Sequence, residues 1–254
     1  MPQFKNILIT GASSGIGEAL ALHYAARGAD NLFLCGRNSR RLSAVAKACR
    51  QNKEVKVHTK VLDITDREAA AAWINECEEV APLNLVFANA GVSTGCETAE
   101  NVYNTFETNI FGVVNTVLPT IELFKKRPHP RYRSIAITSS MAGYHGLMTC
   151  PSYSASKACV KAWGEALRLA LRPQGINVSV ICPGFVRSRI TDQNTCPMPY
   201  FMEAGQAAAI IADGISRNVG LIAFPWQMRL ASWFGSILPN WLSEFIYSKL
   251  PYKV

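Results

Sequence analysis

The alternation of short apolar runs with helix-like segments constrains the fold of this 254-residue chain more than any other feature. Each run is short and continuous, as in a strand that is buried on both faces of a parallel sheet. The expected strands cover residues 6–10, 31–35, 55–62, 84–88, 134–138 and 177–182. Helical patterns lie between them, at residues 16–28, 39–51, 66–80, 99–126 and 153–172. This order, without a long linker, predicts an α/β fold: one domain with a doubly wound parallel sheet.

The last third of the chain departs from this pattern. Residues 191–205 contain Pro197 and Pro199 and are expected to be irregular. Residues 125–133 form a basic, proline-broken segment, which we expect to be a solvated connection. After Pro225 the chain becomes an aromatic-rich tail, residues 226–254. Its apolar positions 230, 234, 237, 241 and 245 follow helical spacing, so we expect a helical tail.

Composition indicates a globular protein, with 49% hydrophobic and 17% charged residues. No apolar run approaches the roughly 18–20 residues of a membrane span, and the strand-like segment at residues 4–10 argues against a signal peptide. The eight cysteines form no Cys-x-x-Cys pair, and Cys35 and Cys182 lie inside apolar runs. We therefore expect buried thiols in a reducing cytoplasm, with no metal site. The net charge of +8 is interpreted as a basic surface with a phosphate pocket, without a nucleic-acid partner.

A glycine-rich run follows the first expected strand and opens the first helix. Gly11, Gly15 and Gly17 allow a tight turn and a close backbone approach to a phosphate, which the helix N-terminus then attracts. The same run contains Gly-x-Ser-x-Gly around Ser13, the pattern of a hydrolase nucleophile elbow. We favour the phosphate cradle, because an elbow usually follows several strands and here only one precedes it.

Tyr153 and Lys157 lie four residues apart on an expected helix and therefore project from one face, offset by only about 40°. An ammonium group beside a phenol favours the phenolate and lowers the pKa of the tyrosine. Such a pair can donate and accept a proton near neutral pH. The spacing alone also fits an ordinary surface pair, so its weight comes from the glycine run and from Ser140 upstream.

Taken together, these motifs resemble those of the classical short-chain dehydrogenase/reductase family, over about residues 4–190. The matching positions, in chain order, are Thr10, Gly11, Gly15, Gly17, Asp63, Asn89, Ala90, Gly91, Asn109, Ser140, Tyr153, Lys157, Pro183 and Gly184. The spacing of thirteen residues to the tyrosine selects Ser140 over Ser139. Two positions depart from the family pattern: Ala88 replaces the first of a usual Asn pair, and Ser188 replaces the usual Thr after Pro-Gly. A serine hydroxyl can make the same hydrogen bond.

The resemblance implies a Rossmann-type fold and hydride transfer with a nicotinamide cofactor. Tyr153 would act as the acid and base, Lys157 would lower the Tyr153 pKa and hold the ribose, and Ser140 would donate to the substrate oxygen. Asn109 would position a water that links Lys157 to solvent. The residues expected to bind the cofactor are Gly11, Ser13, Ser14, Gly15, Ile16, Gly17, Arg37, Asp63, Ile64, Asn89, Ala90, Gly91, Tyr153, Lys157, Pro183, Gly184, Val186 and Ser188.

The end of the second strand bears on which dinucleotide binds. NAD enzymes place a carboxylate there, whereas this chain has Gly36-Arg37. Arg37 could pair with a 2′-phosphate, with Arg40 and Arg41 adding charge nearby. We therefore expect NADP(H), with NAD(H) as the alternative. Ser14, where many NADP-dependent relatives carry a basic residue, argues mildly the other way.

The resemblance also divides the chain into a cofactor and catalytic core (1–190), a substrate segment with the last strand (191–225) and the tail (226–254). Apolar residues in and before the substrate segment predict a hydrophobic ketone, aldehyde or alcohol as substrate. The tail could pack on its own domain or on a partner subunit, close the site as a lid, or contact a membrane surface through residues 226–252. Family members usually form homodimers or homotetramers through the helices at 99–126 and 153–172. The alternatives to a reductase are an NAD-dependent alcohol dehydrogenase and a non-catalytic dinucleotide sensor.

Overall fold

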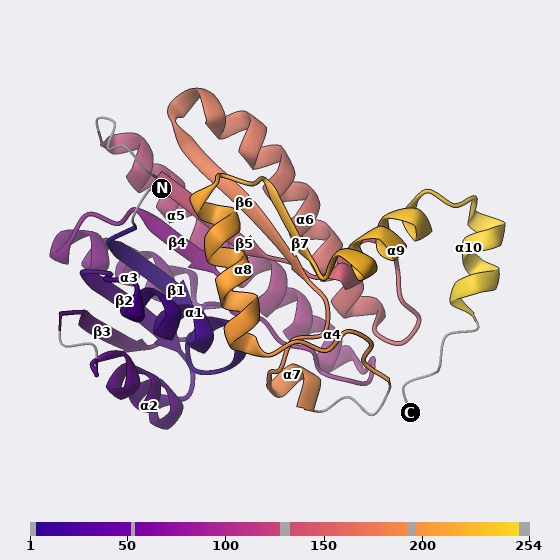
Figure 1. The fold of residues 1–254 in the computed structure, drawn as a ribbon, viewed down its shortest axis with the longest axis horizontal. Coiled ribbons are helices and arrows are strands. Elements are labelled where there is room, and N and C mark those ends of the chain that lie inside the picture. The colour runs from indigo at the N-terminus through magenta and orange to yellow at the C-terminus, as the bar shows by residue number, and fades with distance from the viewer. Residues whose placement is uncertain (1–3, 52–53, 128–132, 193–196, 249–254) are drawn as a thin grey trace.

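A parallel sheet forms the centre of the molecule, as seen in the computed structural model, which describes residues 4–51, 54–127, 133–192 and 197–248 (Figure 1). Seven strands of the described residues pair in the order β3-β2-β1-β4-β5-β6-β7. Their bounds are β1 Asn6–Thr10, β2 Asn31–Gly36, β3 Lys56–Val61, β4 Leu85–Ala88, β5 Arg133–Thr138, β6 Ile176–Pro183 and β7 Leu221–Phe224. Every pairing is parallel, which confirms the predicted doubly wound α/β fold.

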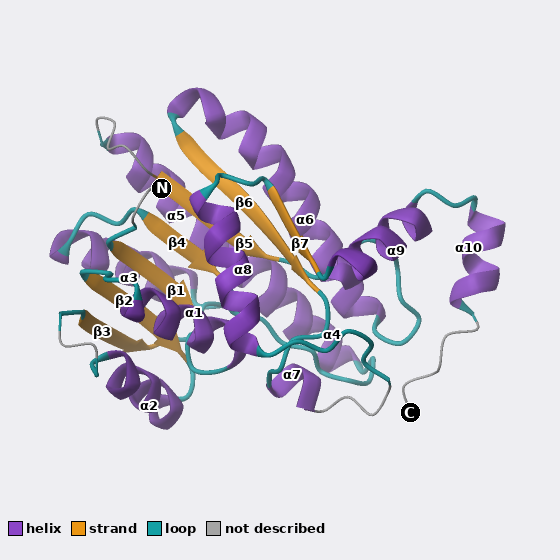
Figure 2. Ribbon diagram, in the orientation of Figure 1, coloured by secondary structure: helices purple, strands orange, loops and turns teal. Residues whose placement is uncertain are grey.

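Helices cover both faces of this sheet (Figure 2). They are α1 Gly15–Ala26, α2 Ser39–Cys49, α3 Arg67–Val80, α4 Ala99–Phe106, α5 Gly112–Lys126, α6 Pro151–Leu171, α7 Arg189–Asp192, α8 Ala204–Ser216, α9 Trp226–Ser236 and α10 Asn240–Tyr247. Alternate strand residues point to opposite faces, so the sheet separates two cores. Ile7 and Ile9 of β1 belong to the core beneath α1, α2 and α8, whereas Leu8 belongs to the core beneath α3, α5 and α6.

The strand order reverses between β1 and β4, and this reversal positions the site. β1 pairs with β2 on one side and with β4 on the other, so the connections after β1 and β4 leave in opposite directions. In an open parallel sheet, a crevice forms at this point outside the carboxyl ends of the strands. The glycine-rich run follows β1 directly, and Asn89 follows β4.

The expected helix at 99–126 is interrupted, which corrects the prediction. A turn of π-helix, Glu107–Phe111, separates α4 from α5. Its Thr108 and Asn109 are both buried. A π turn keeps the chain helical, and the spacing of the apolar residues stays compatible with one continuous helix. The sequence pattern alone therefore does not reveal the turn.

The basic segment at 125–133 differs from the solvated connection that its sequence suggests. Lys125 and Lys126 complete the last turn of α5, and residues 128–132 lie outside the described residues. Arg133 begins β5 and is buried, because its guanidinium donates to the carbonyl oxygens of Phe124 and Gln174. The guanidinium therefore satisfies carbonyl oxygens near the end of α5 and in the turn before β6.

The substrate segment at 191–205 contains more order than its prolines suggest. α7 ends at Asp192, α8 begins at Ala204, and Val186 pairs with Met202 in an isolated parallel bridge. The prediction for residues 193–196 falls outside the described residues. After β7, the tail forms α9 and α10, which extend away from the sheet at the edge of the molecule (Figure 1).

Candidate active site

The glycine-rich turn after β1 is shaped for close backbone approach. Gly11 and Gly15 have φ values of +66° and +59°, a region that side chains rarely adopt. A Cβ on Gly17 would stand 2.3 Å from the Gly11 carbonyl oxygen, so α1 can pack on the turn only with glycine there. Ser13 is not among the residues with positive φ, whereas a nucleophile elbow strains the serine itself. The turn therefore fits a phosphate cradle better than a hydrolase elbow.

Thr10 ties this turn to the end of β4. Its hydroxyl donates to the Phe87 carbonyl oxygen and accepts from the backbone N–H groups of Asn89 and Ala90, at 3.0 and 3.1 Å. The Asn89 amide in turn donates to the Thr10 carbonyl oxygen. These bonds satisfy buried backbone groups on both sides of the crevice and hold its two walls together.

Tyr153 and Lys157 come from the first two turns of α6, as their spacing predicts. The Lys157 ammonium nitrogen lies 5.7 Å from the centre of the Tyr153 ring and donates to the Thr138 carbonyl oxygen at 3.0 Å. It also lies over Gly91, where a Cβ would stand only 3.2 Å away. Lys157 is 3% exposed, so the sheet end and the helix enclose its charge.

The pKa directions of this pair differ from the expected ones. Burial raises the pKa of Tyr153 to about 12, although a hydrogen bond with Ser140 acts to lower it. Burial also lowers the pKa of Lys157 to about 8. Desolvation is the main cause of both shifts in the protein alone, and the expected lowering of the Tyr153 pKa by Lys157 is not seen. The pair holds its protons on the phenol and, near neutral pH, on the amine.

Ser140 and Ser139 play different parts, in line with the choice made from spacing. Ser139 is buried and its hydroxyl donates to the Lys157 carbonyl oxygen at 2.7 Å. Ser140 lies at the cleft wall, accepts from the Ala142 N–H at 3.1 Å and is hydrogen bonded to Tyr153. The Ser140 hydroxyl therefore lies within reach of an oxygen bound beside Tyr153.

Asn109 lies in the π turn with its amide fully engaged. Its Oδ1 accepts from the Val92 N–H at 2.8 Å, and its Nδ2 donates to the Val92 carbonyl oxygen and to Ser156 Oγ. The side chain fastens the loop after β4 to α6 and does not line the cleft. Both amide protons of Asn109 are thus used within the protein, and an expected water would meet the second lone pair of its Oδ1 or the backbone of this turn.

A cleft of about 310 Å³ joins these groups. Among the residues expected to bind a cofactor, Gly17 alone does not line it, because Gly17 serves the packing of α1 on the turn. Arg41, expected to add charge nearby, does line it, and the lining residues that the sequence reasoning did not assign to the site are Gly36, Asn38, Leu62, Val92, Ser93, Thr108, Thr138, Ser139, Arg189 and Thr191. Most of them flank an assigned residue, so extending each motif by a few positions would have found them.

The adenosine end of the cleft carries two arginines. Arg37 is about half exposed and its Nη1 lies 3.5 Å from Asp63 Oδ2. Partial burial acts to raise the pKa of Asp63, but hydrogen bonds from Thr65 and the charge of Arg37 hold it below its usual value. Arg41 also lines the cleft, whereas Arg40 is exposed and does not. The capping bond from the Arg41 N–H to Asn38 Oδ1, at 2.9 Å, places Arg41 in this first turn of α2.

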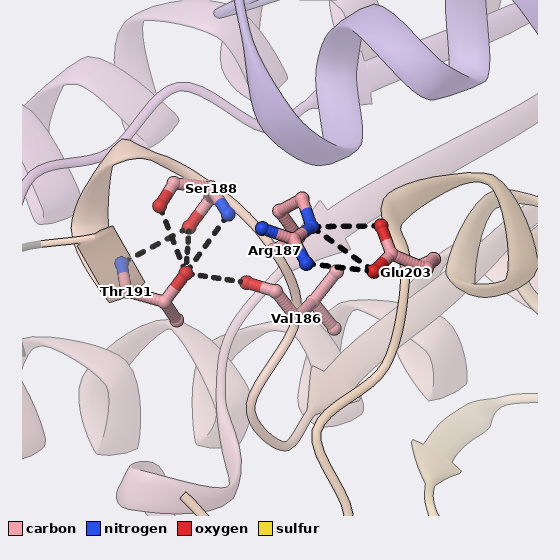
Figure 3. A network of polar contacts seen from close by, with 5 residues as sticks. All are labelled: Val186, Arg187, Ser188, Thr191 and Glu203. Atoms are coloured by element: carbon pink, nitrogen blue, oxygen red, sulfur yellow. Dashed lines mark hydrogen bonds and ion pairs between the residues drawn. The ribbon is translucent and has the colours of Figure 1, made fainter.

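Ser188 belongs to a polar network that holds the start of the substrate segment (Figure 3). The Thr191 hydroxyl accepts from the Ser188 N–H at 2.8 Å and lies 3.0 Å from the Val186 carbonyl oxygen. Arg187 forms a two-pronged ion pair with Glu203 at 2.8 to 3.0 Å. Together with the Val186–Met202 bridge, this network holds residues 186–191 and residues 202–203 together beside the cleft.

The residues present fit a dinucleotide. Glycines with positive φ leave room for a pyrophosphate, and the first turn of α1 offers its N–H groups to it. The buried Nε of Arg41 has no hydrogen-bond partner among the described residues, so a cation is directed at the adenosine end without a protein acceptor. An anionic ligand there would satisfy it.

Comparisons with known proteins agree with this geometry. Residues 5–197 match the family described as short chain dehydrogenase. An uncharacterized oxidoreductase of Myxococcus xanthus is 38% identical over 246 residues, covering 93% of this chain and 94% of that protein. An 11-beta-hydroxysteroid dehydrogenase-like protein 4A of Arabidopsis thaliana is 30% identical, covering 94% and 82%.

Solved structures resemble the whole fold. A short-chain dehydrogenase from Sphingobium yanoikuyae, in complex with NADPH, is 25% identical with a TM-score of 0.80, covering 97% of this chain and 96% of that one. A short-chain dehydrogenase/reductase from Burkholderia phymatum, in complex with NAD, is 21% identical with a TM-score of 0.83, covering 100% and 99%, and it supports the fold alone. The family match, the parallel sheet and the cleft lead to one conclusion: this chain belongs to the short-chain dehydrogenase family of oxidoreductases.

Proposed function

We propose that this protein is an NADP(H)-dependent oxidoreductase that interconverts a hydrophobic ketone or aldehyde and its alcohol. The observation that carries this proposal is the convergence of Ser140, Tyr153 and Lys157 on one cleft with the glycine turn. A bound nicotinamide dinucleotide would supply the hydride. The phosphates would lie on the turn at Gly11 to Gly15, and the nicotinamide ribose would lie beside Lys157.

The protein's own part in the reaction is to orient the substrate oxygen and handle its proton. Ser140 and Tyr153 would both donate hydrogen bonds to that oxygen, so charge that builds there is stabilised. During reduction, the Tyr153 hydroxyl gives its proton to the oxygen. During oxidation, the phenolate takes that proton from the alcohol. Because the Tyr153 pKa is raised, the donor form predominates across the neutral range, which suits reduction.

Proton return to Tyr153 would run through Lys157. The pKa of Lys157, lowered to about 8, lets the amine gain and lose a proton near neutral pH. A water held at the π turn of Asn109 would connect Lys157 to solvent. The Asn109 side chain would hold that turn against the loop after β4 and against α6.

The preference for NADP(H) rests on Arg37 and Arg41. Gly36 ends β2 where an NAD enzyme would carry a carboxylate, and both arginines line the cleft beyond it. A 2′-phosphate would compete with Asp63 for Arg37 and would satisfy the Nε of Arg41. The Sphingobium structure holds NADPH and the Burkholderia structure holds NAD, so the preference rests on the two arginines alone.

Titration of NADPH and NADH, followed by fluorescence, tests the cofactor. Arg37→Ala should weaken NADPH binding about tenfold or more while leaving NADH binding nearly unchanged, because it removes one charge-assisted pair. Arg40→Ala is the matched control, since Arg40 is a neighbouring cation outside the cleft. Equal affinity for both cofactors in the wild type would favour an NAD-dependent alcohol dehydrogenase. Cofactor binding without turnover of any carbonyl would favour a sensor.

The hydrophobic substrate is supported by Val186 and Ile190 in the cleft lining, and by Met148, Tyr200 and Phe201, which are exposed. Phe201 stacks against the Arg187 guanidinium, 5.2 Å from its ring centre. The relatives include a putative ketoacyl reductase of Streptomyces violaceoruber as well as the steroid dehydrogenase-like protein. A reductase screen across apolar and polar carbonyls would test this, and a clear preference for polar ones would contradict it.

The remaining parts of the proposal concern assembly and location. The chain would act as a single dinucleotide-binding domain, 1–254, with 191–225 over the substrate and 226–254 as the tail. Homodimers or homotetramers would form through α4, α5 and α6, where Tyr103, Leu118 and Leu169 are exposed. A reducing cytoplasm suits the buried thiols, since burial raises the pKa of Cys35 to about 12 and that of Cys182 to about 11.

A further inference from the structure

α9 carries a row of large apolar side chains that face water. Trp226 is 70% exposed and Trp233 is 52% exposed. With the neighbouring exposed residues they form a set that we name the tail stripe: Trp226, Leu230, Trp233, Phe234 and Ile237. At 100° of rotation per residue, the five side chains fall within an arc of about 100°. They therefore form one continuous apolar face.

The opposite face of α9 is the one that packs on the body. Gly235 is buried, and a Cβ on Gly184 would stand only 2.6 Å from the Met228 sulfur. Gly184 also lines the active-site cleft, so α9 is fixed relative to that cleft. The usual polarity of a surface helix is thus reversed, because its apolar stripe points outward while its other face is attached. α10 follows α9 at the edge of the molecule (Figure 1), and its Trp241 is 71% exposed.

The helix that bears the stripe's tryptophans carries one cation, Arg229. Between residues 226 and 248 the charged residues are Arg229 and Glu244, and Lys249 follows in the sequence. Arg229 lines a second pocket, of about 630 Å³, together with Trp226, Leu230 and Trp233; Lys161 also lines it but is ion-paired with Glu165 at 3.0 Å. Cations beside tryptophans suit an anionic headgroup above an apolar chain. The net charge of +8 favours approach to an anionic surface.

We propose that the tail stripe binds in the plane of an anionic lipid bilayer surface and makes this protein a peripheral membrane protein. Three tryptophans in two short helices match the preference of this side chain for the membrane–water interface. Helices of eleven and eight residues are too short to span, and none of the described helices meets the length and apolarity of a membrane span. A second copy of the chain has another apolar face, on α4 to α6, available to it. This inference is independent of the proposed substrate.

Co-sedimentation of the full chain with lipid vesicles tests the proposal. The wild type should bind vesicles of mixed phosphatidylcholine and phosphatidylglycerol more strongly than vesicles of phosphatidylcholine alone. The double variant Leu230→Ser with Ile237→Ser should lose about a hundredfold in partition onto mixed vesicles, at roughly tenfold per buried aliphatic side chain. Arg229→Gln should reduce the preference for the anionic vesicles several-fold.

A matched control separates the stripe from general stickiness. Val61 and Val80 are 58% and 57% exposed, as Leu230 and Ile237 are at 57% each, but they lie on β3 and α3. Val61→Ser with Val80→Ser should bind vesicles like the wild type. NADPH affinity and the thermal midpoint should stay unchanged in both doubles, which shows that each is folded. Equal vesicle binding by the two doubles would overturn the proposal. A second result would also overturn it: the wild type does not bind vesicles, and the stripe variant has a lower mass in solution than the wild type. The stripe would then be a subunit interface.

Discussion

Tyr153 and Lys157 each combine a proposed catalytic role with an energetic penalty, which is the cost of desolvating the charged form. Lys157 is enclosed by the sheet end and α6, and Tyr153 is half-buried at the cleft, so desolvation disfavours the charged form of each. A phenol whose pKa is about 12 remains a proton donor throughout the neutral range. A base-requiring reaction in the opposite direction should therefore gain rate as the pH rises.

Replacement of Tyr153 tests this directly. Tyr153→Phe should lower kcat for carbonyl reduction about a thousandfold, since it removes the proton donor and keeps the ring. NADPH affinity should change little. For the wild type, alcohol oxidation should increase with pH, while reduction should stay level at neutral pH and fall above about pH 8, where Lys157 loses the proton that it returns to Tyr153. A variant that retains most of its activity would show that another group donates the proton.

Lys157 yields a stability prediction with a defined sign. Its pKa in the folded protein, about 8, is below the ordinary 10.5, so between these pH values the unfolded chain holds the extra proton. Wild-type stability therefore rises through that window, and the full penalty of the buried charge is present below pH 8. Lys157→Met should raise the free energy of unfolding by about 1–2 kcal/mol at pH 7, after loss of the bond to Thr138.

Urea unfolding of both proteins at several pH values measures that difference. The gain of Lys157→Met should shrink between pH 8 and 10.5 and vanish above it, while activity is lost at every pH. A variant that is less stable than the wild type at pH 7 would contradict the account of burial.

At the level of elements, α6 depends on a residue distant in sequence. Its own N-cap, Cys150, makes no side-chain capping bond. Glu97 supplies one instead, because Oε1 accepts from the Ser152 N–H at 3.0 Å and from the Ser152 hydroxyl at 2.7 Å. A carboxylate at this end also matches the helix dipole. The loop after β4 thereby fixes the turn that carries Tyr153.

Glu97→Ala should lower stability by about 1 kcal/mol, as loss of a capping acceptor usually does. It should also raise KM more than it lowers kcat, because the position of the Tyr153 turn is loosened. Thermal unfolding and steady-state kinetics measure the two effects. Glu97→Gln retains an acceptor and should recover most of both, so equal losses in Ala and Gln would point to the charge alone.

The elements themselves could largely be predicted from the sequence. Strands buried on both faces appear as continuous apolar runs, and the strands β1 to β6 lie within two residues of the expected bounds. The π turn at Asn109, the Glu97 cap and the Arg187–Glu203 pair could not. The first leaves helical spacing intact, and the cap joins residues 55 positions apart, which no local pattern encodes.

At the scale of the whole molecule, the apolar faces that remain exposed concern assembly. Leu169 on α6 is 72% exposed and lies on one of the helices expected to form a subunit interface. Leu169→Asp should place a charge in that interface and reduce the mass in solution to that of a smaller assembly. Size-exclusion chromatography with light scattering measures this. If the variant keeps a mass above that of one chain, unchanged from the wild type, the subunit interface lies on another surface.

The Val186–Met202 bridge and the Arg187–Glu203 ion pair also bear on how such a chain can diverge. They join residues 185–187 to residues 202–203 through backbone hydrogen bonds and one ion pair. These contacts do not involve the residues between the two ends. Once the ends are held, doubling the length between them would cost only about 0.6 kcal/mol of closure entropy. Insertions and replacements there should therefore leave the sheet intact. The stretch between the joined ends can then be exchanged, and substrate preference can change while the cofactor site stays constant.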